Sequence, residues 1–189
     1  SDHDNSQRLQ KIEKELKRIV SIVGSLLSFS RQKQIPKRRV NLIEVIDEVC
    51  LLLSHSLNEK SIKLSKTFPK RRVFISSDEN SLKQILINLL INSIDAVLER
   101  GEISIKVRFY QEQGNAEVTI TDNGYGIPPA IQQDIFAPFY TTKTFKKNSG
   151  LGLSICQHLV ENIGGIITFE SIPGKYTSFT VRLPLDPPA

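Results

Sequence analysis

Two neighbouring stretches of this 189-residue chain, 102–111 and 116–122, alternate between apolar and polar residues, and this pattern leaves few folds open. A period of two residues is typical of a strand with one buried face. Only residues 112–115 separate the two stretches, so we predict an antiparallel hairpin. The same alternation at 165–171 and 178–185 predicts a second pair of strands at the end of the chain.

Apolar residues at helical spacing predict a helix over 41–57, ahead of these strands. Asn41 is suited to be its N-cap, and Glu44 three residues later completes the pattern of a capping box. Two short alternating stretches follow at 62–68 and 72–76, with a turn between them at Pro69 and Lys70. We expect these two strands to pair with each other.

A strong helix is predicted over 77–100, because Ser77 or Asp78 can cap its start and Gly101 is suited to end it. Shorter helices are expected at 129–136 and 150–162. The residues between them, 138–149, are predicted to form an irregular loop that is long enough to be a functional lid.

The predicted elements do not alternate as strand–helix–strand units. The fold class that fits is α+β: a two-layer α/β sandwich with a mixed, largely antiparallel sheet and helices on one face. We assign this domain to residues 36–189, preceded by a long coiled-coil-type helix in residues 1–35.

The preceding segment carries apolar residues at alternating spacings of three and four, which is the seam of a coiled coil. These residues are Leu9, Ile12, Leu16, Ile19, Val23 and Leu26. A lone helix cannot bury such a seam, so a helical bundle is expected, and a homodimer is the simplest way to build one. Pro36 disfavours helical geometry at Ile35 and ends the segment.

Charge and composition argue against a nucleic-acid-binding protein and against a membrane-spanning segment in this chain. The net charge of +5 comes partly from the clusters Lys37–Arg39 and Lys70–Arg72, which lack interleaved aromatic residues. We interpret them as solvated surface and expect no nucleic-acid partner. No apolar run reaches the length of a membrane span, so a cytoplasmic fragment is expected, with any membrane contact through segments absent from this chain. Cys50 and Cys156 fall in apolar helical patterns and are expected to be buried thiols.

Two pairs of glycines could bring a ligand close to the backbone, although neither pair completes a P-loop or a dinucleotide-binding motif. Gly124 and Gly126 follow Asp122 at the end of a predicted strand. Gly150 and Gly152 stand at a predicted helix start, where free amides favour a phosphate. Taken alone, each pair is equally compatible with an ordinary turn.

Asn88, Asn92 and Asp95 are spaced to share one face of an otherwise apolar helix. Asn92 offers a neutral carbonyl oxygen that suits a magnesium ion bridging phosphates. A polar stripe that simply faces solvent is the alternative.

Four ordered segments together resemble the nucleotide-binding boxes of sensor histidine kinases. They are Asn88–Asn92, Asp122–Gly126, Phe136–Lys143 and Gly150–Leu153. The resemblance extends over roughly residues 78–185, and the two helices before it are similar to the end of a dimerisation domain. It implies the ATP-binding sandwich shared with type II topoisomerases, mismatch-repair ATPases and heat-shock chaperones.

The resemblance also implies roles for individual residues. Asp122 would accept a hydrogen bond from the adenine amino group, and Thr177 would support that contact through water. Asn92 would hold Mg²⁺ against the phosphates, and Lys143 would belong to a lid above them. The catalytic residues implied are Asn88, Asn92 and Lys143. The ATP-binding residues implied are Asn88, Asn92, Asp95, Asp122, Gly124, Gly126, Ile127, Phe136, Thr141, Thr142, Lys143, Ser149, Gly150, Leu151, Gly152, Leu153 and Thr177.

The activity implied is transfer of the γ-phosphoryl group of Mg-ATP to a histidine, for relay to the receiver domain of a response regulator. The sequence departs from the family pattern at Tyr176, where glycine is usual, and at Asp95, where many relatives carry a basic residue. His3 lies too close to the end of the seam helix to be the phosphoacceptor, so the acceptor is expected outside this chain. A clamp or chaperone-type ATPase, or a scaffold module with a degenerate pocket, remains the alternative.

Overall fold

The computed structural model describes residues 37–141 and 150–186. The predicted seam helix in residues 1–35 lies outside the described residues. Those described form β1 (Arg38–Asn41), α2 (Leu42–Leu52), α3 (Ser54–Glu59), β2 (Lys63–Thr67), β3 (Phe74–Ser77), α4 (Glu79–Ala96), β4 (Glu102–Tyr110), β5 (Asn115–Asp122), the 3-10 turn η1 (Pro129–Ile131), α5 (Gly152–Ile163), β6 (Ile166–Ile172) and β7 (Tyr176–Pro184).

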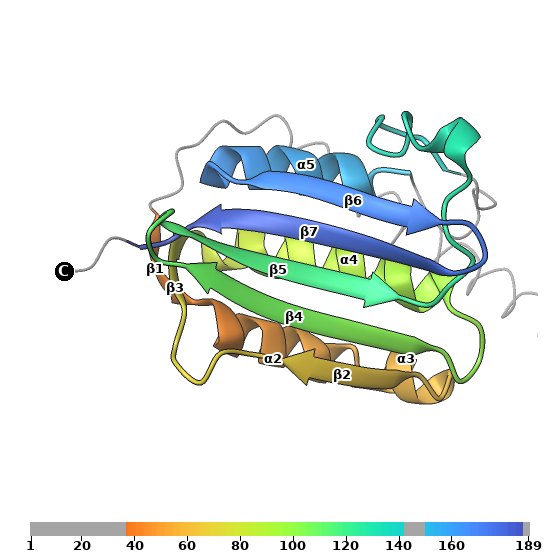
Figure 1. Cartoon of the computed structure of the whole chain (residues 1–189), viewed down its shortest axis with the longest axis horizontal. Coiled ribbons are helices and arrows are strands. Elements are labelled where there is room, and N and C mark those ends of the chain that lie inside the picture. The colour runs from red at the N-terminus through yellow and green to blue at the C-terminus, as the bar shows by residue number, and fades with distance from the viewer. Residues whose placement is uncertain (1–36, 142–149, 187–189) are drawn as a thin grey trace, which may run out of the picture.

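Five of the strands form one sheet in the order β2-β4-β5-β7-β6, while β1 and β3 form a separate two-stranded sheet. Only the β2–β4 pair is parallel; the other three pairs are antiparallel. Figure 1 shows the large sheet in front, with α2, α4 and α5 together behind it. The predicted two-layer α+β sandwich is therefore confirmed.

The hairpin predicted from alternation is present as β4 and β5, whose register runs from Ile103↔Asp122 to Tyr110↔Asn115. Alternate residues of both strands are buried against the helices, while their neighbours face the open side. On the other side of β5, strand β7 places Thr177 directly opposite Asp122. The antiparallel register of β5 and β7 thus brings these two polar residues to the same buried face.

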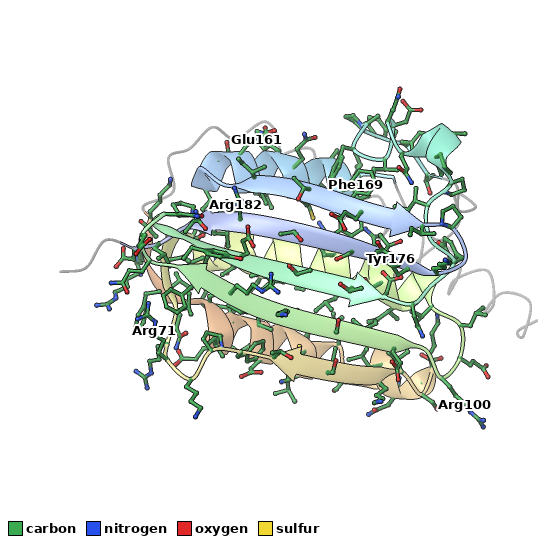
Figure 2. The ribbon with its side chains drawn as sticks, in the orientation of Figure 1. Arg71, Arg100, Glu161, Phe169, Tyr176 and Arg182 are labelled. Carbon is green, nitrogen blue, oxygen red and sulfur yellow. The ribbon has the colours of Figure 1, made fainter. Side chains whose placement is uncertain are left out.

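The open face of the sheet is polar. Cross-strand hydrogen bonds join Thr119 to Thr180 at 3.1 Å and Thr121 to Ser178 at 2.8 Å. Arg182, labelled in Figure 2, pairs with Glu117 on the neighbouring strand at 2.7 Å. These contacts tie β5 to β7 from the side opposite the helices.

The predicted pairing of 62–68 with 72–76 is wrong. β2 pairs with β4 in parallel, and β3 pairs with β1. The connection between them is anchored elsewhere, because the Arg71 guanidinium lies 3.4 Å from the centre of the Phe109 ring on β4. The cation–π contact is compatible with β2 lying beside β4, and Ile75 of β3 is completely buried where β3 pairs with β1.

The helix α4 ends at Ala96, four residues earlier than predicted. Its last carbonyl groups find partners from outside the helix, since Lys60 Nζ donates to Ile94 O at 2.6 Å and to Val97 O at 3.3 Å. The backbone amide of Tyr125 donates to Ala96 O. With these groups satisfied by tertiary contacts, no glycine is needed to end the helix.

The other helices differ from prediction in smaller ways. The predicted helix 41–57 is interrupted at Leu53, which separates α2 from α3, although the Asn41 side chain does accept a hydrogen bond from Ile43 N. The predicted helix 129–136 is only the short turn η1. Both cysteines are buried free thiols, as expected. In the part of the chain that the structure describes, no helix has the length and apolar character needed to span a membrane.

Candidate nucleotide-binding site

Asp122 is the last residue of β5, and its carboxylate is almost completely buried, with 2% of the residue exposed. Ser93 on α4 donates its hydroxyl hydrogen to Asp122 Oδ2 at 2.9 Å. The backbone amide of Gly124 donates to Asp122 Oδ1 at 3.0 Å. The carboxylate therefore has a fixed direction, because each of its oxygens accepts a hydrogen bond from the protein.

The loop after Asp122 passes between the end of α4 and the β6–β7 turn. A side chain at Gly124 would put its Cβ 2.5 Å from Ala96 O, and one at Gly126 would lie 2.4 Å from Ile172 O. Gly126 also has a positive φ of 70°. Both positions therefore require glycine, as the sequence predicts for a loop with a close backbone approach.

Hydrogen bonds with hydroxyl and amide side chains fix the C-terminal part of this loop at Ile127. Ile127 N donates to Ser171 Oγ at 2.8 Å, and Ser171 Oγ lies 3.0 Å from Thr177 Oγ1. Gln132 Nε2 donates to Ile127 O at 2.9 Å. Tyr125 is half-exposed, and burial together with the charges of Asp95 and Asp122 raises the pKa of its phenol.

The predicted polar stripe on α4 faces the start of α5. Gln84 Nε2 donates to Asn88 Oδ1 at 3.1 Å, while Asn88 Nδ2 donates to Gly152 O at 3.3 Å. Asn92 lies one turn further along and borders the same space. Asp95 is half-buried on the following turn.

The helix α5 begins at Gly152, with Leu151 as its N-cap, and no side chain within the described residues caps its first amides. Gly150, just before it, has a positive φ of 70°, and a Cβ there would lie 2.5 Å from the Phe139 carbonyl carbon. The free amides and the helix dipole make this end of α5 favourable for an anion.

A cavity of about 440 Å³ connects these groups, which is the size of a typical small-molecule site. Its lining includes many of the predicted residues: Asn88, Asn92, Asp122, Gly126, Ile127, Thr141, Gly150, Gly152, Leu153 and Thr177. Four other predicted residues, Asp95, Gly124, Phe136 and Leu151, do not line it. Thr142, Lys143 and Ser149 lie outside the described residues.

Phe136 does not line the cavity but packs against a residue that does. Its ring packs edge-on against Phe179, at 6.5 Å between centroids, and against Phe169 at 5.9 Å. Phe179 in turn lines the cavity. Leu151 is buried, so it also belongs to the packing around the site.

Sequence reasoning included Ile127 and Leu153 but missed these other lining residues, which are mostly apolar: Ile91, Ala96, Tyr125, Pro128, Ile131, Ile135, Tyr140 and Phe179. Two signals were available. Phe179 follows Thr177 by two residues and so faces the same side of β7, and Tyr125 lies between the two loop glycines. Nothing in the local pattern distinguishes Ile135 from an ordinary core residue.

The cavity thus has two chemically different ends. One end presents a buried carboxylate and a hydroxyl, and suits a ligand group that donates hydrogen bonds. The other end presents asparagine side chains and the amides of α5, and suits a ligand group that carries negative charge.

Comparisons with known proteins show the family to which the chain belongs. Residues 77–187 match the family described as "Histidine kinase-, DNA gyrase B-, and HSP90-like ATPase". The signal transduction histidine-protein kinase AtoS of Escherichia coli (strain K12) is 33% identical over 99% of this chain and 30% of its own length. Sporulation kinase A of Bacillus subtilis (strain 168) is 34% identical over 90% of this chain and 28% of its own length. The chain therefore spans less than a third of either relative.

Solved structures show the same fold. The catalytic domain of histidine kinase ThkA superposes with a TM-score of 0.72 at 32% identity, covering 81% of this chain and 100% of that domain. Histidine kinase ThkA in complex with response regulator protein TrrA gives a TM-score of 0.76 at 30% identity, covering 93% of this chain and 49% of that one.

Proposed function

Because the chain belongs to the histidine kinase-, DNA gyrase B- and HSP90-like ATPase family, we propose that its cavity binds Mg-ATP as the catalytic core of a sensor histidine kinase. The observation that carries the proposal is the buried Asp122 carboxylate, held by two donors at one end of a cavity whose other end is the start of α5.

The two ends give the nucleotide one orientation. The adenine amino group is a donor and fits against the Asp122 carboxylate, whereas the carbonyl of guanine at the same position would meet it unfavourably. The phosphates then lie toward Gly152 and Leu153, where the α5 amides and helix dipole stabilise negative charge. Apolar residues such as Ile91 and Phe179 also line the cavity.

A magnesium ion fits the polar end. Within residues 37–141 and 150–186, no group of three or more histidine, cysteine, aspartate or glutamate side chains could form an all-protein metal cage. Mg²⁺ is commonly held by few protein oxygens together with substrate phosphates, and the Asn92 carbonyl can supply one of them. When bound, the ion would neutralise charge on the phosphates.

Phosphoryl transfer depends mainly on positioning and charge stabilisation, and the residues described can provide both. In our proposal Asp122 and Thr177 fix the base, the α5 amides fix the phosphates, and Lys143 adds a cation from outside the described residues. The γ-phosphoryl passes to a histidine outside this chain, and from there to a response regulator. Two copies of the chain pair as a homodimer through the seam in residues 1–35. The domain acts in the cytoplasm, where ATP is abundant.

An ATPase of the clamp or chaperone type fits this site less well. Hydrolysis needs a general base near the attacking water, and position 88 carries an asparagine, whose amide cannot take a proton. The Asn88 amide is also engaged by Gln84 and by Gly152 O. A scaffold with a degenerate pocket is disfavoured because the cavity is open and its polar groups are in place.

Calorimetric titration with a non-hydrolysable ATP analogue tests nucleotide binding. We expect the native chain to bind, and Asp122→Ala to weaken binding by about tenfold to a hundredfold, since a hydrogen bond to a charged group contributes roughly 1.5 to 3 kcal/mol. Asn92→Ala should remove most of the dependence on magnesium. Ser178→Ala, on the open face of the same sheet, is the matched control and should bind like the native chain. No binding by the native chain would reject the proposal.

A phosphoryl-transfer assay separates the kinase from the ATPase. The chain is incubated with ATP labelled at the γ-phosphate and with a separately supplied dimerisation domain that carries the acceptor histidine. Transfer of label to that domain is the result expected of a kinase. Steady release of inorganic phosphate without any acceptor would favour the clamp-type ATPase instead.

A further inference from the structure

Ser171 contacts three polar groups at the base-binding end of the cavity. It belongs to β6 and lies directly opposite Thr177 of β7. Its Oγ lies 2.8 Å from Ile127 N, 3.0 Å from Tyr176 O and 3.0 Å from Thr177 Oγ1. Two of these neighbours have fixed roles, because a backbone amide can only donate and a backbone carbonyl can only accept.

Ser171 has a single hydroxyl hydrogen, and the group to which it donates this hydrogen determines the direction of its hydrogen bond with Thr177. If Ser171 donates to Tyr176 O, its oxygen can accept from Ile127 N and from the Thr177 hydroxyl, and all three contacts are hydrogen bonds. If Ser171 instead donates to Thr177, its oxygen and the Tyr176 carbonyl oxygen face each other at 3.0 Å with no hydrogen between them. Only the first arrangement satisfies every group.

We propose that Ser171 is a positioning residue that sets the nucleobase specificity of the site, because it engages the hydroxyl hydrogen of Thr177 and leaves Thr177 as a hydrogen-bond acceptor toward the cavity. Asp122, opposite Thr177 across the β5–β7 ladder, is also an acceptor. The Asp122 carboxylate and the Thr177 hydroxyl oxygen then both accept hydrogen bonds, from the edge of the base directly or through water. The inference rests on the proposed binding of ATP and extends it to the residue that makes the site select an amino group over a carbonyl.

The relative affinities of two nucleoside diphosphates, ADP and inosine diphosphate, test this proposal. ADP and inosine diphosphate differ at the base edge, where an amino group is replaced by a carbonyl and the adjacent ring nitrogen gains a hydrogen, and neither carries a γ-phosphoryl that could be transferred. The dissociation constants of both are measured by calorimetry for the native chain, Ser171→Ala, Ser171→Thr and Ser178→Ala. The ratio of the two constants reports specificity, whereas a general loosening of the loop at Ile127 changes both constants together.

We expect the native chain to prefer ADP. In Ser171→Ala the Thr177 hydroxyl can turn and donate toward the carbonyl of inosine, so the preference for ADP should fall by about two- to tenfold, the value of one hydrogen bond. Ser171→Thr retains the hydroxyl and should restore the native ratio. Ser178→Ala removes a hydroxyl from the other face of β7 and should leave the ratio unchanged.

Other outcomes overturn the proposal. Equal weakening of both diphosphates in Ser171→Ala would mean that the residue only supports the loop, and unchanged constants would mean that it does neither. A native chain that binds ADP without preference would reject the role of Ser171 but leave nucleotide binding intact. A native chain that binds neither diphosphate would reject the proposed function itself.

Discussion

Cys156 connects the two helices that border the cavity. Its thiol lies 3.6 Å from Ile85 O on α4, is completely buried, and lies against the Asn88 side chain. Burial raises the pKa of Cys156 to about 12 from an ordinary value of 9.0, and the nearby Asn88 amide offsets only part of that effect. The neutral thiol is therefore part of the packing behind the site, at ordinary pH, and not a reactive group.

This shifted pKa predicts how stability depends on pH. Because the pKa in the folded state is above the value in the unfolded state, the contribution of Cys156 is fully present below pH 9 and is lost as the pH rises toward 12. We expect the free energy of unfolding in urea to fall between pH 8 and pH 10, and the fall to be about 1 kcal/mol smaller in Cys156→Ala. An equal fall in both proteins would contradict this assignment.

The ends of the elements show what local sequence determines and what it leaves open. The β4–β5 hairpin follows from alternation and a short turn, both of which are local properties. The partner of β2 and the last residue of α4 are accompanied by long-range contacts, from Arg71 to Phe109 and from Lys60 to Ile94, between residues that are distant in the sequence. No periodicity or propensity within 62–76 contains that information, which is why the hairpin predicted there is wrong.

Lys60 is expected to stabilise the end of α4. Lys60→Met keeps most of the side-chain length but leaves Ile94 O and Val97 O without their charged donor, so we expect a loss of about 2 kcal/mol in the free energy of unfolding. Lys63→Met is the matched control, because Lys63 pairs with Glu102 on the exposed surface and should cost no more than about 0.5 kcal/mol. Denaturant unfolding curves measure both, and similar losses would count against a capping role.

Gly150 is expected to be intolerant of any side chain. Gly150→Ala combines a positive φ with a Cβ that would lie 2.5 Å from Phe139, so it should disturb the start of α5 and weaken nucleotide binding at least tenfold, roughly the effect of one misplaced contact to phosphate. Gly114→Ala has a similar φ of 63° but no atom within 4 Å of the new Cβ. It should cost about 1 kcal/mol of stability through backbone strain and leave binding unchanged. Calorimetric titration of both variants with the ATP analogue shows whether the loss of binding comes from the clash with Phe139, which only Gly150→Ala has, or from backbone strain, which both variants share.

At the scale of the whole molecule, the polar part of the site could be predicted, but most of the apolar part, apart from Ile127 and Leu153, could not. Asn88, Asn92 and Asp122 occur in ordered motifs with a chemical reason for each residue type, and the structure brings all three to one cavity. Ile135 and Tyr140 belong to the segment after η1 and line the same cavity. Their position is a product of tertiary packing, and an isoleucine of the core has the same local pattern as an isoleucine of a binding site.

The described residues contain a complete hydrophobic core, with contributions from α2, α4, α5 and the sheet. We therefore expect a shortened chain of residues 37–189 to fold and to bind the ATP analogue, but to be monomeric. The full chain should be a dimer through the seam that includes Leu16 and Ile19, because those side chains need a second helix to cover them. Light scattering after size-exclusion chromatography measures both masses. A full chain that is monomeric at micromolar concentration would contradict the predicted bundle.

The parallel pairing of β2 with β4 also determines when the sheet can form during synthesis on the ribosome. Lys63 and Glu102 are partners in that pair, yet they are separated by 39 residues, so the second is translated roughly 2 to 8 s after the first at 5–20 residues per second. Throughout that interval the strand that pairs with β2 has not been made, and the helix α4 is made before the strands β4, β5, β6 and β7. The backbone groups of β2 that pair with β4 therefore stay without that partner until β4 has been made, which is the stage at which an unpaired strand is most exposed to aggregation.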